Sequence, residues 1–372
     1  MIAALDINYN RAKLSSINGR YVTCEHIDAV LEKWSANFQL DSIGTSVQKR
    51  VIKCITLGSG PKKILMWSQM HGNESTTTKA VLDVLHYLDN DFDSFSKIKN
   101  DFTIKIIPIL NPDGAFAYSR ANANGIDLNR DAQDLSQPES KVLRAVFDDF
   151  GPDFCFNLHD QRTIFNVGET QEPATVSFLS PAFDETRGLS AARETSMKLI
   201  VAINQTLQKI IPGKVGRYDD SFNPNCVGDA FQMTAIPTIL FEAGHFPRDY
   251  DRKKTREFIF RALWAAIKSI KDGFETDFLV ASYFDIPENN KKYFDILVKN
   301  ANHLNSNYSK KDSIGILFTE ILKENSIHFE PMVENVGDLT DYFGHVVYDC
   351  SKEKDLKEVK SDMALSKILN KI

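Results

Sequence analysis

Residues 64–88 read ILMWSQMHGNESTTTKAVLDVLHYL and contain three consecutive structural signals. The run from Ile64 to Trp67 is short, apolar and bounded by turn residues, which is typical of a buried strand. From about Ser75 to Leu88, apolar side chains recur on one face, as in an amphipathic helix. A tight turn between the two carries His71 and Glu74. This segment therefore predicts a strand–turn–helix unit with two polar side chains at the carboxyl end of the strand.

The alternation of strand and helix continues on both sides of this unit. Further strands are predicted at 50–57, 103–110, 154–158 and 238–241, and helices at 26–34, 139–150, 191–210 and 254–271. Such alternation is typical of an α/β fold whose sheet contains parallel strands. We therefore expect a mixed, largely parallel twisted sheet with helices on both faces.

The texture of the chain changes beyond about Phe278. A polar break at 287–290 is followed by strand-like runs at 293–298, 315–322 and 346–348, and the last twenty residues are rich in lysine. We predict a large α/β domain over 1–278 and a small β-rich C-terminal domain over 279–372. Its last residues are expected to form a helix or a frayed tail.

Composition and charge exclude several classes of protein. The 372 residues carry a net charge of -6 with both signs interspersed, which indicates neither nucleic acid nor an anionic membrane surface as a partner. No run approaches the roughly 18 apolar residues of a membrane span, and the first residues do not read as an export signal. The five cysteines lie far apart without a C-x-x-C pair, which favours reduced thiols. We expect a cytoplasmic protein, and its oligomeric state is left open.

His159 and Glu242 each follow a predicted strand, as His71 does. Ligands of α/β sheets bind beyond the carboxyl ends of the parallel strands, so these side chains are expected to converge on one rim. Imidazole and carboxylate groups suit zinc, and a catalytic zinc site has three protein ligands and one open position. With His71 and Glu74 forming an H-x-x-E pair, we predict His159 as the third ligand of one zinc ion.

A loop after the strand at 103–110 is rich in groups that bind anions. It reads NPDG at 111–114 and continues with Arg120 and the pair Asn129 and Arg130. Arginine is suited to bidentate capture of a planar carboxylate. The loop therefore predicts a carboxylate-binding site beside the metal.

These motifs, in this order, resemble the zinc metallocarboxypeptidase family of carboxypeptidase A-like peptidases. The family pattern is H-x-x-E, N-P-D-G, an arginine, an Asn-Arg pair, a later histidine after a strand and a glutamate near the end of the domain. The resemblance covers roughly residues 20–270. A more distant similarity, through H-G-x-E and D-L-N-R, connects the chain to the succinylglutamate desuccinylase/aspartoacylase enzymes.

The resemblance implies a role for each residue. Zinc would polarise the scissile carbonyl and lower the pKa of its water toward ~7. Glu242 would take the proton from the water and pass it to the leaving amine, and Arg120 would stabilise the oxyanion. Asn129 and Arg130 would hold the free carboxylate of a peptide or N-acyl amino acid substrate. In the family a tyrosine on a mobile loop covers the substrate, and Tyr218 is the candidate here.

Three functions are compatible with these residues. The intact N-P-D-G followed by Arg120 favours a metallocarboxypeptidase that cuts the C-terminal peptide bond. The β-rich C-terminal region and the expected cytoplasmic location keep an N-acyl amino acid deacylase as the alternative. A catalytically silent binding protein is the third, and the presence of Glu242 with all three ligands argues against it.

A few polar residues near the motifs have less defined expectations. Asp160 is a candidate partner that orients a metal-bound imidazole. His245 is expected to be a structural loop histidine rather than a ligand or proton shuttle. The segment 217–228 matches the family poorly, so the side-chain preference is open; acidic residues at Asp219, Asp220 and Asp229 would favour a basic substrate group unless they are merely solvated.

Overall fold

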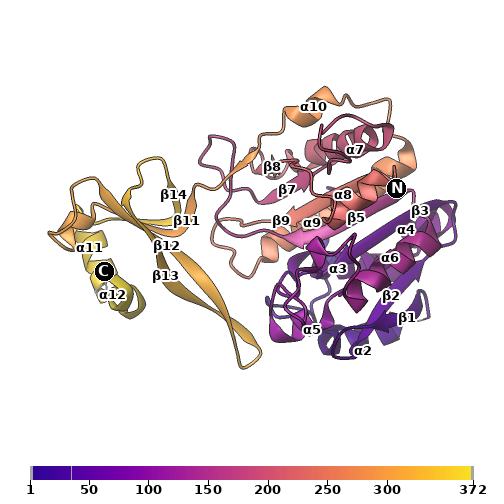
Figure 1. Cartoon of the computed structure of the whole chain (residues 1–372), viewed down its shortest axis with the longest axis horizontal. Coiled ribbons are helices and arrows are strands. Elements are labelled where there is room, and N and C mark those ends of the chain that lie inside the picture. The colour runs from indigo at the N-terminus through magenta and orange to yellow at the C-terminus, as the bar shows by residue number, and fades with distance from the viewer. Residues whose placement is uncertain (1–2, 35, 370–372) are drawn as a thin grey trace.

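The computed structural model describes residues 3–34 and 36–369 and has two parts (Figure 1). The larger part is an eight-stranded mixed sheet between two layers of helices, and the smaller part is a four-stranded sheet with two helices at the C-terminal end. Both expected features, the mixed α/β sheet and the β-rich C-terminal region, are confirmed. The predicted division at residue 278 stays a prediction.

The central sheet has the strand order β1-β2-β4-β3-β5-β9-β7-β8. Its strands are β1 (Gln39–Thr45), β2 (Val51–Leu57), β3 (Lys62–Ser68), β4 (Phe102–Ile107), β5 (Phe154–Asp160), β7 (Val176–Leu179), β8 (Val215–Arg217) and β9 (Thr238–Ala243). The four inner strands β4, β3, β5 and β9 run parallel, whereas the pairs β1–β2, β2–β4 and β7–β9 are antiparallel and the outer pair β7–β8 is parallel. The parallel centre brings the ends of β3, β5 and β9 to one edge.

Each face of the sheet has its own apolar core. Along β3, Ile64 and Met66 pack into the core under α3 (Thr76–Asn90), α7 (Ala191–Leu207) and α9 (Lys253–Asp272), whereas Leu65 and Trp67 pack under α6 (Pro138–Phe150) and α8 (Val227–Met233). Burial on both faces explains why the strand reads as one continuous apolar run. None of the helices in the described part of the chain is both long and apolar enough to cross a membrane.

The remaining helices lie at the N-terminal side and in the connections: α1 (Tyr9–Ala12), α2 (Cys24–Trp34), α4 (Phe92–Asp101), α5 (Pro112–Ala117) and the single-turn helix η1 (Leu128–Arg130). The NPDG segment, which was expected to belong to a loop, instead begins α5. Asn111 accepts a hydrogen bond from the backbone N–H of Gly114, and Pro112 occupies the first helical position. Both features favour a helix start.

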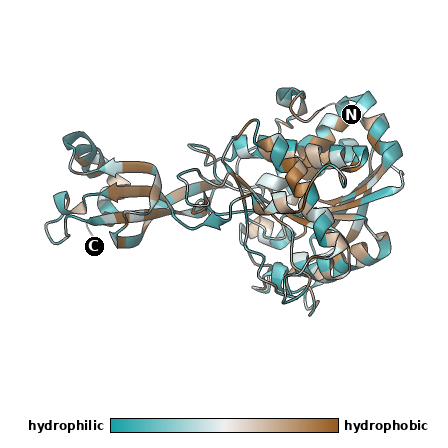
Figure 2. Ribbon diagram, turned by 90° about the horizontal axis from the view of Figure 1, so that it is seen from above, coloured by the Kyte–Doolittle hydropathy of each residue, from teal (hydrophilic) through white to brown (hydrophobic). Residues whose placement is uncertain are grey.

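The C-terminal part contains β11 (Tyr293–Lys299), β12 (Asp312–Lys323), β13 (Ser326–Asp338) and β14 (Phe343–Asp349), in the order β13-β12-β11-β14. The lysine-rich end forms α11 (Glu353–Ser361) and α12 (Met363–Leu369). Figure 2 shows apolar residues along the strands of this sheet, which has a core separate from that of the larger part. The long β12–β13 hairpin extends back toward α5 (Figure 1).

Two short elements join the parts. Helix α10 (Ala281–Phe284) packs on α7, and β10 (Asn289–Asn290) pairs with β6 (Asn166–Val167) of the larger part. A further single-turn helix, η2 (Ala301–His303), follows β11. The chain therefore remains attached to the larger part until just before β11 begins.

Candidate active site

His71, Glu74 and His159 meet at the carboxyl edge of the sheet. His71 and Glu74 lie in the turn between β3 and α3, and His159 lies in the neighbouring strand β5. His71 Nδ1 is 2.9 Å from Glu74 Oε1, and His159 Nδ1 is 2.9 Å from Glu74 Oε2. The two Nδ1 atoms are 3.1 Å apart. Three potential ligand atoms, all within 4.8 Å of one another, thus face a common point.

The arrangement of these atoms fits a zinc ion. Tetrahedral coordination with Zn–N bonds of ~2.0–2.1 Å places neighbouring ligand atoms about 3.3 Å apart, close to the distances seen here. Two imidazole nitrogens and one carboxylate are the donor set of many catalytic zinc sites. A buried carboxylate next to two imidazoles is also expected to be ionised, and His71 and His159 hold the pKa of Glu74 below its usual range although burial raises it.

The turn that carries the ligands depends on a glycine. A Cβ atom at Gly72 would lie 1.9 Å from the backbone carbon of Gly114, at the N-terminal end of α5. Residue 72 must therefore be glycine for the turn to rest on the helix. Gln69 Nε2 donates to the Gly72 carbonyl at 2.8 Å and fixes the turn further. The NPDG segment thus packs against the turn that carries His71 and Glu74.

The orienting partner of His71 is Asp127, which the sequence motifs did not single out. Asp127 Oδ1 lies 2.9 Å from His71 Nε2, so this ring donates its Nε2 proton and keeps Nδ1 free for a metal. Asp160, the expected partner, accepts hydrogen bonds from the backbone N–H groups of Thr76 and Thr77 at the start of α3. No partner of His159 Nε2 is found among the described residues. The prediction for Asp160 was therefore wrong in this structure.

Glu242 lies on β9 directly opposite His159 in the parallel register, so both side chains point to the same side of the sheet. Its Oε2 atom is buried and has no hydrogen-bond partner among the described residues. Burial raises the pKa of Glu242 well above its ordinary value, and the negative charge of Glu74 adds to the rise. A carboxylate with an elevated pKa beside a metal site is suited to proton transfer.

His159 and Glu242 line a pocket of 370 Å³ that also contains the predicted anion-binding groups. Arg120 is half-exposed, with Nη1 3.2 Å from His71 Nδ1 and Nη2 3.0 Å from Asp127. Asn129 Oδ1 accepts from the backbone N–H of Val227 at 3.2 Å, which leaves the amide N–H groups of Asn129 for a ligand. Arg120 and Asn129 therefore present donors to the same space.

Arg130 and Tyr218 are also in this pocket. Arg130 is exposed and donates to the Asn129 carbonyl at 2.7 Å. Tyr218 lies in the segment after β8 with its ring 5.3 Å from that of Phe165. Burial raises the pKa of Tyr218 well above its ordinary value, and the charge of Glu242 raises it further, which keeps the phenol protonated as a hydrogen-bond donor. Every residue predicted from the sequence to act in the site thus lines one pocket.

The acidic residues Asp219, Asp220 and Asp229, in and beside the segment 217–228 that matches the family poorly, differ in their environments. Asp220 pairs with the buried Arg193, and Asp219 is exposed at the pocket rim. Asp229 is buried in the pocket lining, and burial raises its pKa to about 7. Asp229 is therefore the acidic group best placed to meet the side chain of a substrate.

His245 lies away from the metal-binding atoms, at the contact between the two parts. Its ring centroid is 4.1 Å from that of His345 and 4.7 Å from that of Tyr250. Neither ring nitrogen has a hydrogen-bond partner among the described residues. His345 Nε2 lies 2.8 Å from the Thr163 carbonyl. Both histidines therefore lie in the interface between the two parts, and the buried ring of His245 makes packing contacts there rather than hydrogen bonds.

Several known proteins with a related sequence or fold are carboxypeptidases. The family model for zinc carboxypeptidase matches residues 23–165, which include all the predicted site residues up to His159 but not Tyr218 or Glu242. Cytosolic carboxypeptidase 6 of Caenorhabditis elegans is 33% identical over 101 residues, covering 25% of this chain and 22% of that protein. Carboxypeptidase M of Mus musculus is 28% identical over 169 residues, covering 38% of this chain and 36% of that protein.

The comparison with solved structures also finds a carboxypeptidase. Carboxypeptidase A of Helicoverpa armigera superimposes with a TM-score of 0.56 and 19% identity, over 73% of this chain and 78% of that one. At this identity the match shows the fold alone. The chain spans only 19% to 36% of the length of the curated carboxypeptidases that it matches.

Proposed function

Because residues 23–165 match the zinc carboxypeptidase family model, we propose that the chain is a zinc-dependent metallocarboxypeptidase that hydrolyses the C-terminal peptide bond of its substrate. One observation carries this proposal. The His71–Glu74–His159 cluster, Glu242 and the donors Arg120, Asn129 and Arg130 line a single pocket of 370 Å³.

His71, Glu74 and His159 would hold one zinc ion. When bound, zinc supplies a Lewis acid that polarises a carbonyl and makes water acidic enough to attack at neutral pH. Glu242, opposite His159 on the next strand, accepts the proton of the attacking water and delivers it to the leaving amine. Burial raises the pKa of this carboxyl, which makes the carboxylate a stronger base for the first step.

The hydrogen-bond donors of the pocket have two targets on the substrate, the scissile carbonyl and the terminal carboxylate. Arg120 lies within 3.4 Å of Glu74 and faces the place where negative charge develops on the carbonyl oxygen, so it stabilises the oxyanion. Asn129 and Arg130, farther along the same loop, bind the terminal carboxylate of the substrate. Tyr218 donates its phenol proton to the bound chain end. Recognition of a free carboxylate restricts cleavage to the last residue.

The released residue is proposed to be basic. Asp229 is a buried acidic group of the pocket lining outside the metal-binding cluster, and its carboxylate would pair with an ammonium or guanidinium group. Because its pKa is about 7, the pairing develops fully only above neutral pH.

An N-acyl amino acid deacylase remains the second candidate. The observation that favours it is the C-terminal sheet, whose β12–β13 hairpin lies against the catalytic part beside the metal site and leaves limited room on the acyl side. Both candidates use the same zinc ligands, the same base and the same carboxylate-binding residues.

The experiment combines metal content with activity. Inductively coupled plasma mass spectrometry of the purified protein is expected to give one zinc per chain. Peptides with a free C-terminus should be cleaved and their C-terminally amidated counterparts should not, and a chelator should abolish cleavage. Glu242→Gln should retain zinc and lose about 10²–10⁴-fold in kcat. Zinc-free protein, or a Glu242→Gln variant as active as wild type, overturns the proposal.

A further inference from the structure

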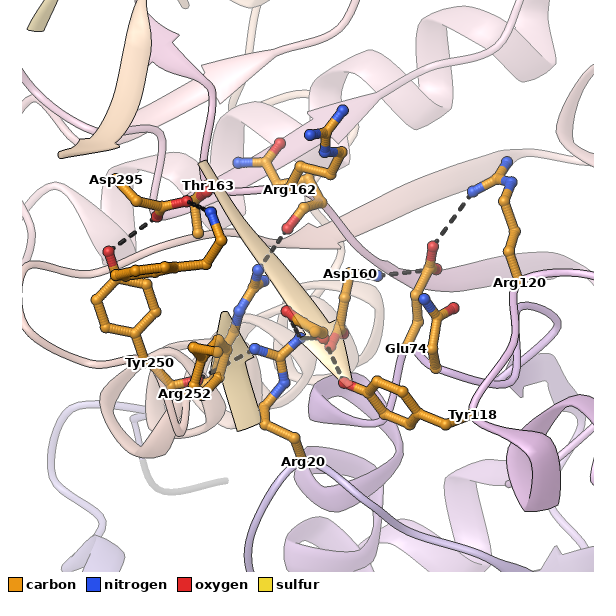
Figure 3. A pocket seen from close by; sticks show the side chains of 15 residues that line it. Arg20, Glu74, Tyr118, Arg120, Asp160, Arg162, Thr163, Tyr250, Arg252 and Asp295 are labelled. Atoms are coloured by element: carbon orange, nitrogen blue, oxygen red, sulfur yellow. Dashed lines mark hydrogen bonds and ion pairs between the residues drawn. The ribbon is translucent and has the colours of Figure 1, made fainter. Parts of the chain in front are cut away.

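A second pocket, of 310 Å³, lies between the catalytic part and the C-terminal sheet (Figure 3). Phe318, Glu320 and Phe329 of the β12–β13 hairpin line one side of it. The other side includes Glu74 and Arg120, which also line the catalytic pocket. The two pockets therefore adjoin at the metal site.

The second pocket lies on the acyl side of the bond to be cut. Asn129, Arg130 and Asp229 line only the catalytic pocket, so the residue to be released occupies that pocket. The substrate must pass the metal ligand Glu74 and the adjoining Arg120. The group that precedes the scissile bond then enters the second pocket. This reasoning rests on the proposed function.

Polar contacts hold the wall of this pocket in place. Glu320 of β12 pairs with Arg20 at 2.9 Å and accepts a hydrogen bond from the Tyr118 hydroxyl. Arg20 is buried, and Tyr118 ends the helix that leads into the Arg120 loop. The hairpin is therefore fixed to the catalytic part beside Arg120.

Aromatic contacts close the wall on another side. The rings of Phe318 and Phe329 each lie 5.3 Å from the ring of Tyr250. Asp295 of β11 accepts from the Tyr250 hydroxyl and from the backbone N–H of Phe318, both at 2.8 Å. At 310 Å³ the pocket lies at the lower end of the roughly 300–1,000 Å³ found for small-ligand sites. It has room for a small group, and a longer chain meets the hairpin.

The carboxylates that line this pocket already have partners. Asp160 binds the first N–H groups of α3, Asp295 binds Tyr250, and Glu320 binds Arg20.

Two arginines of the pocket have no carboxylate partner among the described residues. Arg252 is buried and donates only to the carbonyl oxygens of Ala243 and Gln161. Arg162 is exposed, lines both pockets and has no hydrogen bond or ion pair in the described part of the chain. A carboxylate entering between the two pockets would meet this unpaired positive charge.

We propose that the second pocket is the acyl-side subsite, that the C-terminal sheet limits it to a small group, and that it selects an acyl group carrying a carboxylate. Arg162 contacts that carboxylate, and the buried Arg252 adds to the positive potential of the subsite. The preferred substrate is thus a short one, with an acidic residue or a dicarboxylic acyl group before the scissile bond.

The charge preference is tested with acetyl-Glu-Leu and acetyl-Gln-Leu, which have nearly the same shape. Wild type is expected to show about a tenfold higher kcat/KM for the acidic substrate. Arg162→Met should reduce this ratio to near one, whereas Arg162→Lys should retain part of it. The control Arg144→Met, on the exposed face of α6, should leave the ratio unchanged.

The length limit is tested by comparing acetyl-Glu-Leu with acetyl-Ala-Ala-Ala-Glu-Leu. In wild type the longer peptide is expected to have a kcat/KM about tenfold lower. Phe329→Ala, which removes one ring of the wall, should raise cleavage of the longer peptide with little change for the short one. Met332→Ala, an exposed apolar side chain on the same strand, is the matched control. Equal kcat/KM for both lengths and for both charges in wild type overturns the inference while the proposed function stands.

A binding measurement separates the inference from the proposed function. Glu242→Gln protein is titrated calorimetrically with the same two dipeptides. If no peptide is cleaved by wild type, the proposed function fails, but tighter binding of acetyl-Glu-Leu than of acetyl-Gln-Leu, lost in Glu242→Gln/Arg162→Met, still supports an anion-selective acyl subsite. Equal binding of the two dipeptides overturns it.

Discussion

The two ring nitrogens of His71 have different tasks. Nδ1 faces Glu74 and His159, and Nε2 donates to Asp127. A carboxylate in this position fixes the tautomer and raises the basicity of the ligating nitrogen. The same carboxylate pairs with Arg120 at 3.0 Å, so it also positions the proposed oxyanion donor.

Asp127→Asn is therefore expected to weaken zinc binding by about 10–100-fold while leaving the fold intact. The measurement is a competition between the protein and a chromophoric chelator of known zinc affinity. Asp219→Asn, at the pocket rim and away from the ligands, serves as the control. Unchanged zinc affinity in Asp127→Asn would show that the carboxylate does not orient the ligand.

The ionisation of Asp229 predicts a pH-dependent specificity. Burial raises its pKa to about 7, so the carboxyl is mostly neutral at pH 6 and mostly charged at pH 8. The ratio of kcat/KM for a Lys-terminated peptide to that for a Leu-terminated peptide should rise as the pH increases through 7. Asp229→Asn should make this ratio low and independent of pH. A ratio that is flat in wild type would contradict the role of Asp229.

The grouping of His71, Glu74 and His159 could be predicted because the relevant information is local. His71 and Glu74 share one turn, and His159 follows an apolar strand, so the rule for strand ends brings them together. Asp127 and Arg162 lie in or beside the predicted motifs, but their partners depend on how the loops fold back. Asp160 illustrates the limit: it is adjacent to a ligand, yet it binds the start of α3. Adjacency in sequence does not determine which hydrogen bond a loop side chain makes.

Among the elements, α3 and α9 are joined by a buried ion pair beneath the site. Asp83 of α3 receives hydrogen bonds from Arg256 of α9 at 2.6 and 2.7 Å, and from Tyr9 and the backbone of Leu14, each at 2.7 Å. Asp83 and Arg256 are both buried. One carboxylate thus ties the N-terminal segment to the two helices behind the metal-binding turn.

Removing one partner leaves the other as an uncompensated buried charge. Asp83→Ala is expected to lower the free energy of unfolding by about 3–5 kcal/mol. Asp148→Ala breaks the exposed pair with Arg144 on α6 and should cost less than about 1 kcal/mol. Urea denaturation followed by tryptophan fluorescence measures both. Equal losses in the free energy of unfolding for the two substitutions would show that the buried pair stabilises the fold no more than the exposed pair.

Elements with a strong pattern were predicted well. The strand at 64–67 and the helix at 75–88 appear as β3 and α3, with boundaries shifted by one or two residues. The outer strand β13 was missed because Pro331 interrupts the alternation of Ile327, Phe329 and Val333 with exposed residues. Such an edge strand can accommodate proline, since its outer N–H groups need no partner in the sheet. Its existence depends on pairing with β12, which is a tertiary effect.

At the scale of the whole molecule, the contact between the two parts joins residues that are far apart in the chain. Arg20, Tyr118 and Glu320 come from the N-terminal segment, the end of α5 and the C-terminal hairpin. No periodicity or motif connects these positions. The sequence predicted that a small β-rich region follows the α/β domain, but not that it lies beside the metal site.

The ion pair at this contact predicts coupled opening of the hairpin and the catalytic loop. Glu320→Gln leaves the buried guanidinium of Arg20 without its carboxylate and removes the anionic acceptor of Tyr118. Loss of a charge-assisted contact costs about 1–3 kcal/mol, which corresponds to a roughly 5–150-fold larger population of the open form. Amide hydrogen exchange should therefore accelerate both in 312–323 and in 118–122.

The matched control is Glu330→Gln, on the neighbouring strand of the same hairpin. Glu330 pairs with Lys323 at the exposed hairpin end, so its loss should alter exchange only locally. Faster exchange confined to 312–323 in Glu320→Gln would mean that the hairpin docks without affecting the loop that carries Arg120. Acceleration in both segments would show that the C-terminal sheet holds part of the catalytic pocket in place.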